Sequence, residues 1–206
     1  MIEITQTSVF NFENALRGAR NPMNSWDRMD SRYDESGRFV LGENDLALAA
    51  KLCKAGSDHR KFMRQIIVSA DICAPAYWWK EFDTYKVGTV ANSTSTMHKI
   101  HVKPFELNDF SHDKLNENGM RILSGLIEEL ETIRLEYNRT KDKAYWYALI
   151  QLLPLSYNQL RTCTLSYENL LNMYAARKSH KLHEWQEFCV WISGLPYAEN
   201  LICCVK

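Results

Sequence analysis

Residues 74–98 read Ala74-Pro-Ala-Tyr-Trp-Trp-Lys-Glu-Phe-Asp-Thr-Tyr-Lys86, followed directly by Val87-Gly-Thr-Val-Ala-Asn-Ser-Thr-Ser-Thr-Met-His98. The first half is largely aromatic, and its side chains at positions 77, 78, 81, 82 and 85 recur at the three- and four-residue spacing of one helix face. Pro75 suits a first helical turn, and Gly88 is expected to end the helix. The stretch therefore predicts an aromatic helix that runs into a polar loop.

The polar loop is a candidate binding site. Residues 89–96 carry mostly hydroxyl and amide side chains, which do not build a core but, together with the backbone amides of a turn, donate hydrogen bonds to an anion. A capped helix followed by a Ser/Thr-rich surface turn is the simpler interpretation of the same residues. Both interpretations stay open on this stretch alone.

Length and charge limit the possible classes of protein. The 206 residues suffice for one domain with a buried core, so a single domain over residues 1–206 is expected. The 25 basic and 25 acidic residues balance, which leaves no global field for binding nucleic acid or a membrane surface. The first residues lack a basic or apolar targeting segment, and no apolar run approaches about eighteen residues. We therefore expect a cytoplasmic protein without a nucleic-acid or membrane partner, whose anion sites are local.

Common catalytic and metal-binding motifs are absent from the sequence. The six cysteines form no Cys-x-x-Cys pair and are expected to be reduced and structural. His98 and His101, like His180 and His183, stand three residues apart without an evident third ligand, so no metal site is predicted. No nucleophile elbow, Walker loop or dinucleotide glycine fingerprint is present. Hydrolase, P-loop and Rossmann-type functions therefore have no support.

Hydrophobic periodicity predicts an alternation of strands and helices around the aromatic helix. Strands are expected at residues 1–9, 65–71 and 160–165. Helices are expected at residues 11–20, 43–55, 118–138, 141–153, 169–178 and 182–193. Residues 21–42 predict a long ordered loop, because linkers seldom carry aromatic rings such as Trp26, Tyr33 and Phe39.

Four segments of the chain, taken in order, make up a further pattern. Residues 14–20 read Asn-Ala-Leu-Arg-Gly-Ala-Arg, and residues 56–62 read Gly-Ser-Asp-His-Arg-Lys-Phe. Residues 84–86, Thr-Tyr-Lys, are followed after seven residues by Thr94. Leu153-Pro154 precedes an alternating strand, then Asn172, four residues and Arg177, and then His183-Glu-Trp-Gln186. In this order the chain resembles the flavin-dependent thymidylate synthases from end to end.

The resemblance assigns positions residue by residue. The family motif Arg-His-Arg, seven residues and Ser, which holds flavin and nucleotide, falls on Thr84-Tyr85-Lys86 and Thr94. The family's Ser and Glu within that motif fall on Thr89 and Asn92, and its second arginine falls on Thr96. Its Gly-His-x-Ser-x-Phe-Glu-His turn corresponds to residues 56–62. Its Asn-Phe-x-x-x-Arg and Ala-Gln-Trp-Glu segments correspond to the segments that contain Arg177 and Glu184.

The resemblance implies a fold, a reaction and ligands. The implied fold is α+β, with helices packed around a mainly antiparallel sheet, and the implied assembly is a homotetramer with sites between subunits. The implied reaction is reductive methylation of dUMP to dTMP with FAD and methylenetetrahydrofolate. The implied FAD-binding residues are Tyr85, Lys86, Thr89 and Asn92, and the implied nucleotide-binding residues are Thr94, Arg177 and Glu184.

Two hypotheses about function follow. The first is an enzyme, in which Lys86 and Arg177 hold the phosphate and residues 89–96 surround the ligand. The second is a catalytically inactive nucleotide- or flavin-binding or assembly protein that retains the fold. The retained Lys86, Thr94 and Arg177 favour the first hypothesis. The replacement of the family's first arginine and histidine by Thr84 and Tyr85 favours the second.

Overall fold

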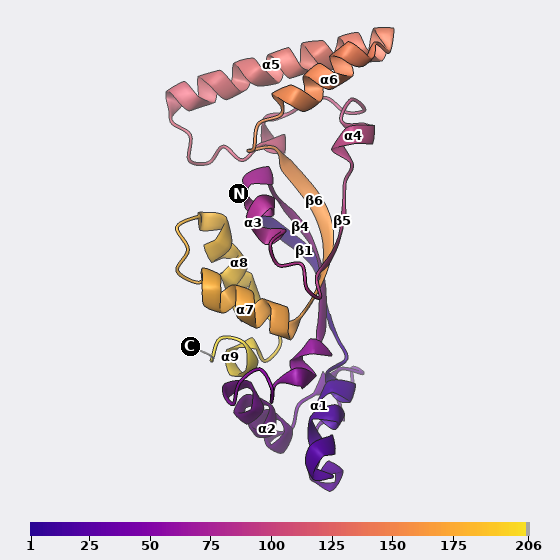
Figure 1. Ribbon diagram of the computed structural model, residues 1–206, viewed down its shortest axis with the longest axis vertical. Helices are drawn as coiled ribbons and strands as arrows, with labels where there is room; N and C mark the ends of the chain where they lie inside the picture. Colours follow the sequence, from indigo (N-terminus) through magenta and orange to yellow (C-terminus); the bar gives the residue numbers. More distant parts are fainter. Residues whose placement is uncertain (205–206) are drawn as a thin grey trace. The chain divides into compact units, whose positions relative to one another are not determined.

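The computed structural model describes residues 1–204 (Figure 1). Contacts between residues divide the chain into two compact units. Unit 1 comprises Met1–Glu3, Ile72–Thr84 and Asn92–Thr162. Unit 2 comprises Ile4–Asp71, Tyr85–Ala91 and the chain from Cys163 onward. The single domain expected over residues 1–206 stays a prediction.

Four strands form one sheet in the order β1-β4-β6-β5, and two short strands pair in a second sheet. The bounds are β1 Glu3–Phe10, β2 Arg32–Tyr33, β3 Phe39–Val40, β4 Ile67–Pro75, β5 Val90–Ser93 and β6 Asn158–Ser166. In the second sheet β2 and β3 run antiparallel, with Arg32 opposite Val40 and Tyr33 opposite Phe39. Helices with a mainly antiparallel sheet make the fold α+β, which confirms the predicted class.

The helices have the bounds α1 Phe12–Arg20, α2 Glu43–Lys54, α3 Ala76–Phe82, α4 Thr96–Lys99, α5 Glu117–Thr140, α6 Lys143–Leu152, α7 Tyr167–Arg177, α8 His183–Ser193 and α9 Ala198–Leu201. Six of the helices, α1, α2, α5, α6, α7 and α8, lie close to where periodicity predicts them, whereas the short helices α4 and α9 were not predicted. Short 3₁₀ turns occur at Asn21–Met23, Trp26–Arg28, Lys61–Arg64 and Leu107–Asp109. Over residues 1–204, no helix has both the length and the apolar character needed to cross a membrane.

Strand β4 extends past the predicted residues 65–71 to Pro75. Alternate side chains along it, Val68, Ala70, Ile72 and Ala74, are at most 1% exposed, which is the two-residue period of a strand with one buried face. Pro75 is extended, with ψ of 153°, and stands before the first residue of α3. The proline therefore closes the strand and caps the helix instead of lying in its first turn.

Helix α3 ends at Phe82, so the prediction that it continues to Gly88 is wrong. The Thr84 hydroxyl donates to the Glu81 carbonyl at 2.7 Å, a local bond that competes with helix continuation. Asp83 caps the helix and pairs with Arg161 of β6 at 2.7 Å. Tyr85 therefore does not belong to the aromatic helix face.

The aromatic side chains of α3 pack in the core. Trp78, Trp79 and Phe82 are each at most 1% exposed, and their ring centroids lie 4.8 to 5.1 Å apart. The indole of Trp79 also donates to the carbonyl of Gln159 at 3.0 Å. These three aromatic side chains therefore serve core packing.

The polar residues 89–96 do not form one loop. Val90–Ser93 is the edge strand β5, and its side chains are exposed. Thr94 directly follows the strand, and its backbone N–H donates a hydrogen bond to the carbonyl of Leu160 at 2.9 Å. The hydroxyl-rich pattern does not predict this strand, because backbone hydrogen bonds, and not a buried side-chain face, hold it to the sheet.

A buried ion pair in unit 2 orders the segment before α2. The carboxylate of Asp45 accepts hydrogen bonds from Arg20 Nε at 2.7 Å and from the backbone N–H of Ser31 at 3.0 Å. Arg20 also donates to the backbone carbonyls of Ser25 and Arg28. This network explains why residues 21–42 form an ordered segment as expected, although the segment also contains the unpredicted β2–β3 hairpin.

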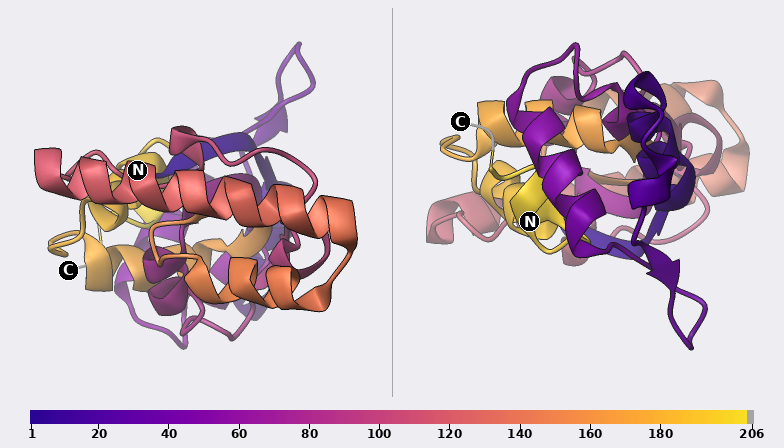
Figure 2. Two further views of the ribbon diagram at one scale, coloured as in Figure 1. Left: turned by 90° about the horizontal axis from the view of Figure 1, so that it is seen from above. Right: turned by 90° about the horizontal axis from the view of Figure 1, so that it is seen from below.

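The core of unit 1 is an antiparallel pair of helices. Figure 2 shows α5 and α6 side by side, and their facing apolar side chains include Leu123, Leu130 and Leu149. Lys141, which is left-handed with φ of 59°, ends α5 and allows the chain to turn back. The amphipathic pattern of residues 118–138 is thus explained by packing against α6.

We predict that Asp45→Asn destabilises the protein by about 3 kcal/mol at neutral pH, because it leaves the buried Arg20 charge without its partner. Burial raises the pKa of Asp45, but hydrogen bonds from Ser31 and Arg20 outweigh this and hold the pKa below 3.8. The wild-type pair therefore contributes stability above that pH and loses it as the pH falls below it. Urea unfolding of both proteins between acidic and neutral pH measures the effect.

The control is Glu136→Gln, which breaks the exposed pair with Arg139 on α5. We expect a change below about 0.5 kcal/mol for this variant. Equal losses in the two variants would contradict the structural role of the buried pair.

Candidate functional site

Residues 85–89, which carry three of the predicted FAD-binding side chains, are anchored to helix α7 of the same unit. The side-chain amide of Asn169, in the first turn of α7, donates to the carbonyl of Val87 at 2.7 Å. Asn169 also forms a capping box with Ser166. Gly88 has φ of 74°, and a Cβ there would lie 3.2 Å from Asn169 Oδ1. The turn and its amide anchor thus fix the course of this loop.

Arg177 joins this loop to helix α8. Arg177 is the last residue of α7, where the helix dipole favours a positive charge. Its Nε donates to the hydroxyl of Tyr85 at 2.9 Å. Its guanidinium carbon lies 4.9 Å from the ring centroid of Trp185 and 5.6 Å from that of Tyr85. We call these three residues the arginine cluster.

Lys86 and Glu184 are each adjacent in the sequence to a member of the arginine cluster. Lys86 follows Tyr85 and is exposed. Glu184 precedes Trp185 in the first turn of α8 and is only 6% exposed. A carboxylate there is favoured by the positive end of the helix dipole. Of the predicted site residues, the structure thus brings Tyr85 and Arg177 into contact. Lys86 and Glu184 are sequence neighbours of Tyr85 and Trp185.

Thr89 offers a buried polar group to a ligand. Its Oγ1 is inaccessible to solvent and has no hydrogen-bond partner among residues 1–204. A buried hydroxyl without a partner costs on the order of 1–3 kcal/mol, so such a group in a predicted site is a candidate ligand contact.

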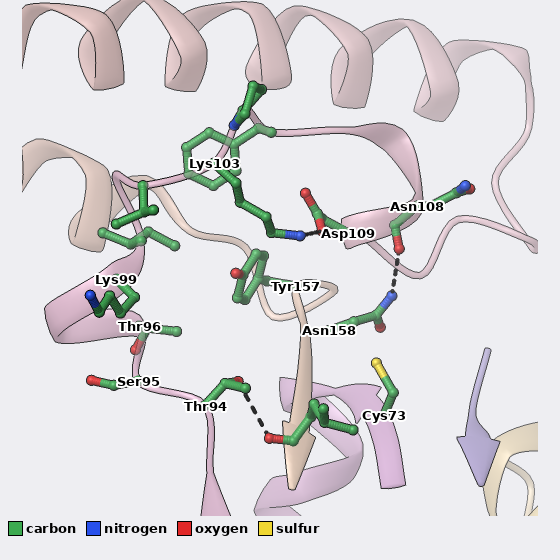
Figure 3. Close-up of a pocket in the computed structure, with 15 residues that line it drawn as sticks. Cys73, Thr94, Ser95, Thr96, Lys99, Lys103, Asn108, Asp109, Tyr157 and Asn158 are labelled. Carbon is green, nitrogen blue, oxygen red and sulfur yellow. Dashed lines mark hydrogen bonds and ion pairs between the residues drawn. The ribbon is translucent and has the colours of Figure 1, made fainter. Parts of the chain in front are cut away.

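Asn92 and Thr94 belong to unit 1. Asn92 is exposed on β5, and Thr94 lines a cavity of about 460 Å³ (Figure 3). The Thr94 hydroxyl donates to the Leu160 carbonyl at 3.3 Å. We call this space the unit 1 cavity.

Charged and ionisable groups of unit 1 also face this cavity. Lys103 Nζ pairs with Asp109 Oδ1 at 2.6 Å, and this hydrogen bond raises the pKa of Lys103 (Figure 3). Burial raises the pKa of the Tyr157 phenol and of the Cys73 thiol, so both are neutral at neutral pH. The cavity therefore combines one ion pair with neutral polar groups.

The segment at residues 56–62 lines a separate cavity in unit 2. This cavity has a volume of about 530 Å³, and Asp58, His59 and Phe62 lie in its wall with residues of α1 and α2. His59 is a candidate ligand contact that is not among the site residues predicted from the sequence. The partial match of this segment to the family's glycine-histidine turn is the sequence feature that could have identified His59.

Two further residues of the site were not predicted. Asn169 anchors the loop, and Trp185 supports the arginine of the cluster. A capping pattern and a tryptophan beside Glu184 are weak signals, since both are common in ordinary helices. All six cysteines are free, and within residues 1–204 no three His, Cys, Asp or Glu side chains are grouped so as to hold a metal ion.

Comparison with known proteins identifies the fold. No protein-family model and no curated protein matches the sequence. Two solved structures of flavin-dependent thymidylate synthase from Helicobacter pylori, complexed with FAD and dUMP, match 99% and 100% of this chain and all of their own. Their TM-scores are 0.71 and 0.72, each with 17% sequence identity.

A third solved structure supports the same assignment. The UMP/dUMP methylase PolB from Streptomyces cacaoi, bound with 5-Br dUMP, matches over 100% of this chain and 95% of its own. Its TM-score is 0.65 at 13% identity. The likeness therefore extends through the whole length of the chain, as the four matching places in the sequence predict. This chain has the fold of the flavin-dependent thymidylate synthases, the family that its sequence resembles.

Proposed function

We propose that this protein binds a uridine monophosphate nucleotide and catalyses flavin-dependent methylation of dUMP to dTMP. The arginine cluster carries the proposal, because it unites residues from three sequence segments that the resemblance relates to ligand binding. Arg177 and Lys86 provide the positive charge for the phosphate, and Arg177 grips it through parallel hydrogen bonds. Thr94 and Glu184 contact the same nucleotide in this proposal.

FAD and methylenetetrahydrofolate are the proposed cofactor and co-substrate. The buried, unpartnered Oγ1 of Thr89 fits a bound cofactor, since a ligand atom would satisfy it. Tyr85, Lys86, Thr89 and Asn92 are the residues proposed to hold FAD. When bound, reduced flavin supplies a hydride and methylenetetrahydrofolate supplies the carbon. The residues of this chain would bind and orient the reactants and supply positive charge.

Two replacements in the family motif favour a second candidate function, nucleotide or flavin binding without turnover. The family's histidine is replaced by Tyr85, whose hydroxyl accepts a hydrogen bond from Arg177. The first arginine of the motif is replaced by Thr84, which bonds to Glu81 at the end of α3. Both replacements remove positive charge from a site that must neutralise a phosphate dianion. Product formation separates the two functions.

We predict that Arg177→Ala weakens binding of dUMP at least tenfold, or about 1.4 kcal/mol, because it removes the planar group that grips the phosphate. Arg177→Lys should also weaken binding, since an ammonium lacks the two parallel donors. Isothermal titration calorimetry measures both. The melting temperature should fall by only a few degrees from loss of the contacts with Tyr85 and Trp185.

Lys178→Ala is the matched control, since it removes the same charge from the next, exposed residue. This variant should bind dUMP within about twofold of wild type. Equal binding by wild type and Arg177→Ala would locate the nucleotide elsewhere. If the wild type binds neither nucleotide nor flavin, the proposed function itself fails.

We predict that the purified protein binds FAD and converts dUMP to dTMP when reduced flavin and methylenetetrahydrofolate are present. Thr89→Val should weaken FAD binding about tenfold, because it removes the hydroxyl proposed to contact the cofactor. Absorption spectra after FAD titration measure binding, and chromatography of the nucleotides measures product. Binding of dUMP and FAD without dTMP would favour the second candidate function.

The homotetramer implied by the resemblance and the cytoplasmic location expected from the lack of a targeting segment form part of the same proposal. Shared sites between subunits require an oligomer at working concentration. Light scattering at micromolar protein tests this point, and a monomer would remove the shared-site arrangement from the proposal.

A further inference from the structure

We propose that Asn169 is a positioning residue for the cofactor: its side-chain amide holds residues 86–89 on the course that presents Lys86 and Thr89 to FAD. This inference rests on the proposed function. The loop and helix α7 both belong to unit 2, so every contact in the argument lies within one unit.

Side-chain packing does not hold this loop. Lys86, Val87 and Gly88 are all exposed, and Val87 is 88% exposed although it is apolar. An apolar side chain that stays in water contributes no burial energy that could fix the backbone. The course of residues 86–88 therefore depends on the polar contacts of the loop backbone.

The amide of Asn169 provides such a contact. Its Nδ2 donates to the carbonyl of Val87 at 2.7 Å. The next residue lies against the same amide, because a Cβ at Gly88 would be 3.2 Å from Asn169 Oδ1 and 3.6 Å from Nδ2. The φ of Gly88, 74°, also lies in the left-handed region that favours glycine. The turn thus accommodates the amide because residue 88 has no side chain.

Capping of α7 does not by itself explain an amide at position 169. Asn169 Oδ1 accepts from the backbone N–H of Ser166 at 3.0 Å and from the Ser166 hydroxyl at 2.7 Å. A carboxylate at this place in a capping box accepts equally well, and glutamate is common there. The amide adds a donor, and that donor binds Val87. Anchoring the loop is therefore the task that requires asparagine.

A second contact fixes the loop on the other side of Lys86. The hydroxyl of Tyr85 accepts from Arg177 Nε at 2.9 Å, and Arg177 is the last residue of α7. From Asn169 to Arg177 the helix rises by about 12 Å. Tyr85 and Val87 are thus held at opposite ends of one helix. These two anchors restrict the backbone of Lys86 and leave its side chain exposed for a ligand.

Thr89 connects the anchored turn to the ligand. It directly follows Gly88, and its Oγ1 is buried without a hydrogen-bond partner among residues 1–204. A hydrogen bond from this hydroxyl to a ligand atom requires a separation of about 2.5–3.0 Å, so the turn must hold the hydroxyl in place. If the turn is loose, binding has to order it, which weakens affinity. Asn169 therefore acts on the cofactor through Thr89 and Lys86.

Asn169→Asp tests this role. The aspartate keeps an oxygen that accepts both bonds from Ser166 but places a second oxygen, in place of the donor, against the Val87 carbonyl. We expect FAD binding to weaken about tenfold. The melting temperature should change by no more than about 2 °C, because the cap is retained and a carboxylate in the first turn suits the helix dipole.

A double-mutant cycle identifies the residue through which Asn169 acts. In the Thr89→Val background, Asn169→Asp should weaken FAD binding by less than about threefold, because the positioned hydroxyl is already absent. A loss of stability alone would not produce this dependence on Thr89. Absorption spectra during titration with FAD measure all four proteins.

Trypsin provides a readout without any ligand. The bond after Lys86 lies at the anchored turn, and Lys86 is exposed. We expect trypsin to cleave this bond at least fivefold faster in Asn169→Asp than in wild type, because the released loop opens more often. Mass spectrometry of the fragments identifies the cleaved bond.

Asn116→Asp is the matched control. Asn116 caps α5 in unit 1, where its Oδ1 accepts from the backbone N–H of Gly119 at 2.9 Å. The chemical change at a helix start is the same, but the loop at residues 85–89 is not involved. FAD affinity and cleavage after Lys86 should both equal those of wild type.

Four outcomes would overturn the inference. Equal FAD affinity of wild type and Asn169→Asp would do so and leave the proposed function intact. Equal cleavage after Lys86 would show that the amide does not hold the loop. A full tenfold effect in the Thr89→Val background would contradict action through Thr89. A wild-type protein that binds no FAD would end the proposed function and the positioning role together, and the wild-type titration distinguishes this outcome from the others.

Discussion

The burial of one face of α3 fixes the helix that leads directly into the segment of the chain that carries Tyr85 and Lys86. Trp78, Trp79 and Phe82 are packed against one another and almost fully removed from water, which fixes the helix in its unit. Arg161 then lies 4.1 Å from the ring centroid of Trp79 and pairs with the capping Asp83. Because the helix is closed at this point, Tyr85 is released from the aromatic face and contacts Arg177 instead.

In the proposed function, the arginine cluster compensates in part for the basic side chains that the family motif has and this chain lacks. An unconstrained arginine loses about 2 kcal/mol of side-chain entropy when a ligand immobilises it. The hydrogen bond to Tyr85 and the rings of Tyr85 and Trp185 already restrict Arg177 in the ligand-free protein. Less entropy remains to be lost on binding, so one preorganised guanidinium contributes more than one that is free to rotate.

The sequence predicts elements well where side-chain periodicity decides the structure. The long pattern at residues 118–138 located α5, because its buried face packs on α6. The end of α3 was missed because the bond of Thr84 and the pairing of Asp83 with distant Arg161 do not follow from helical periodicity. Strand β5 was missed because backbone bonds hold its exposed polar residues. For the site, resemblance located Tyr85 and Arg177, whose contact the structure then established, but gave no signal for the anchoring role of Asn169.

A chain with zero formal net charge attracts anions only where positive charge is locally in excess. In unit 2 the guanidinium of Arg177 lies against the rings of Tyr85 and Trp185, an arrangement that suits the several oxygens of a phosphate. A planar guanidinium offers parallel donors where an ammonium offers one point charge, so the phosphate preference proposed for this chain depends on the geometry of Arg177 more than on its charge.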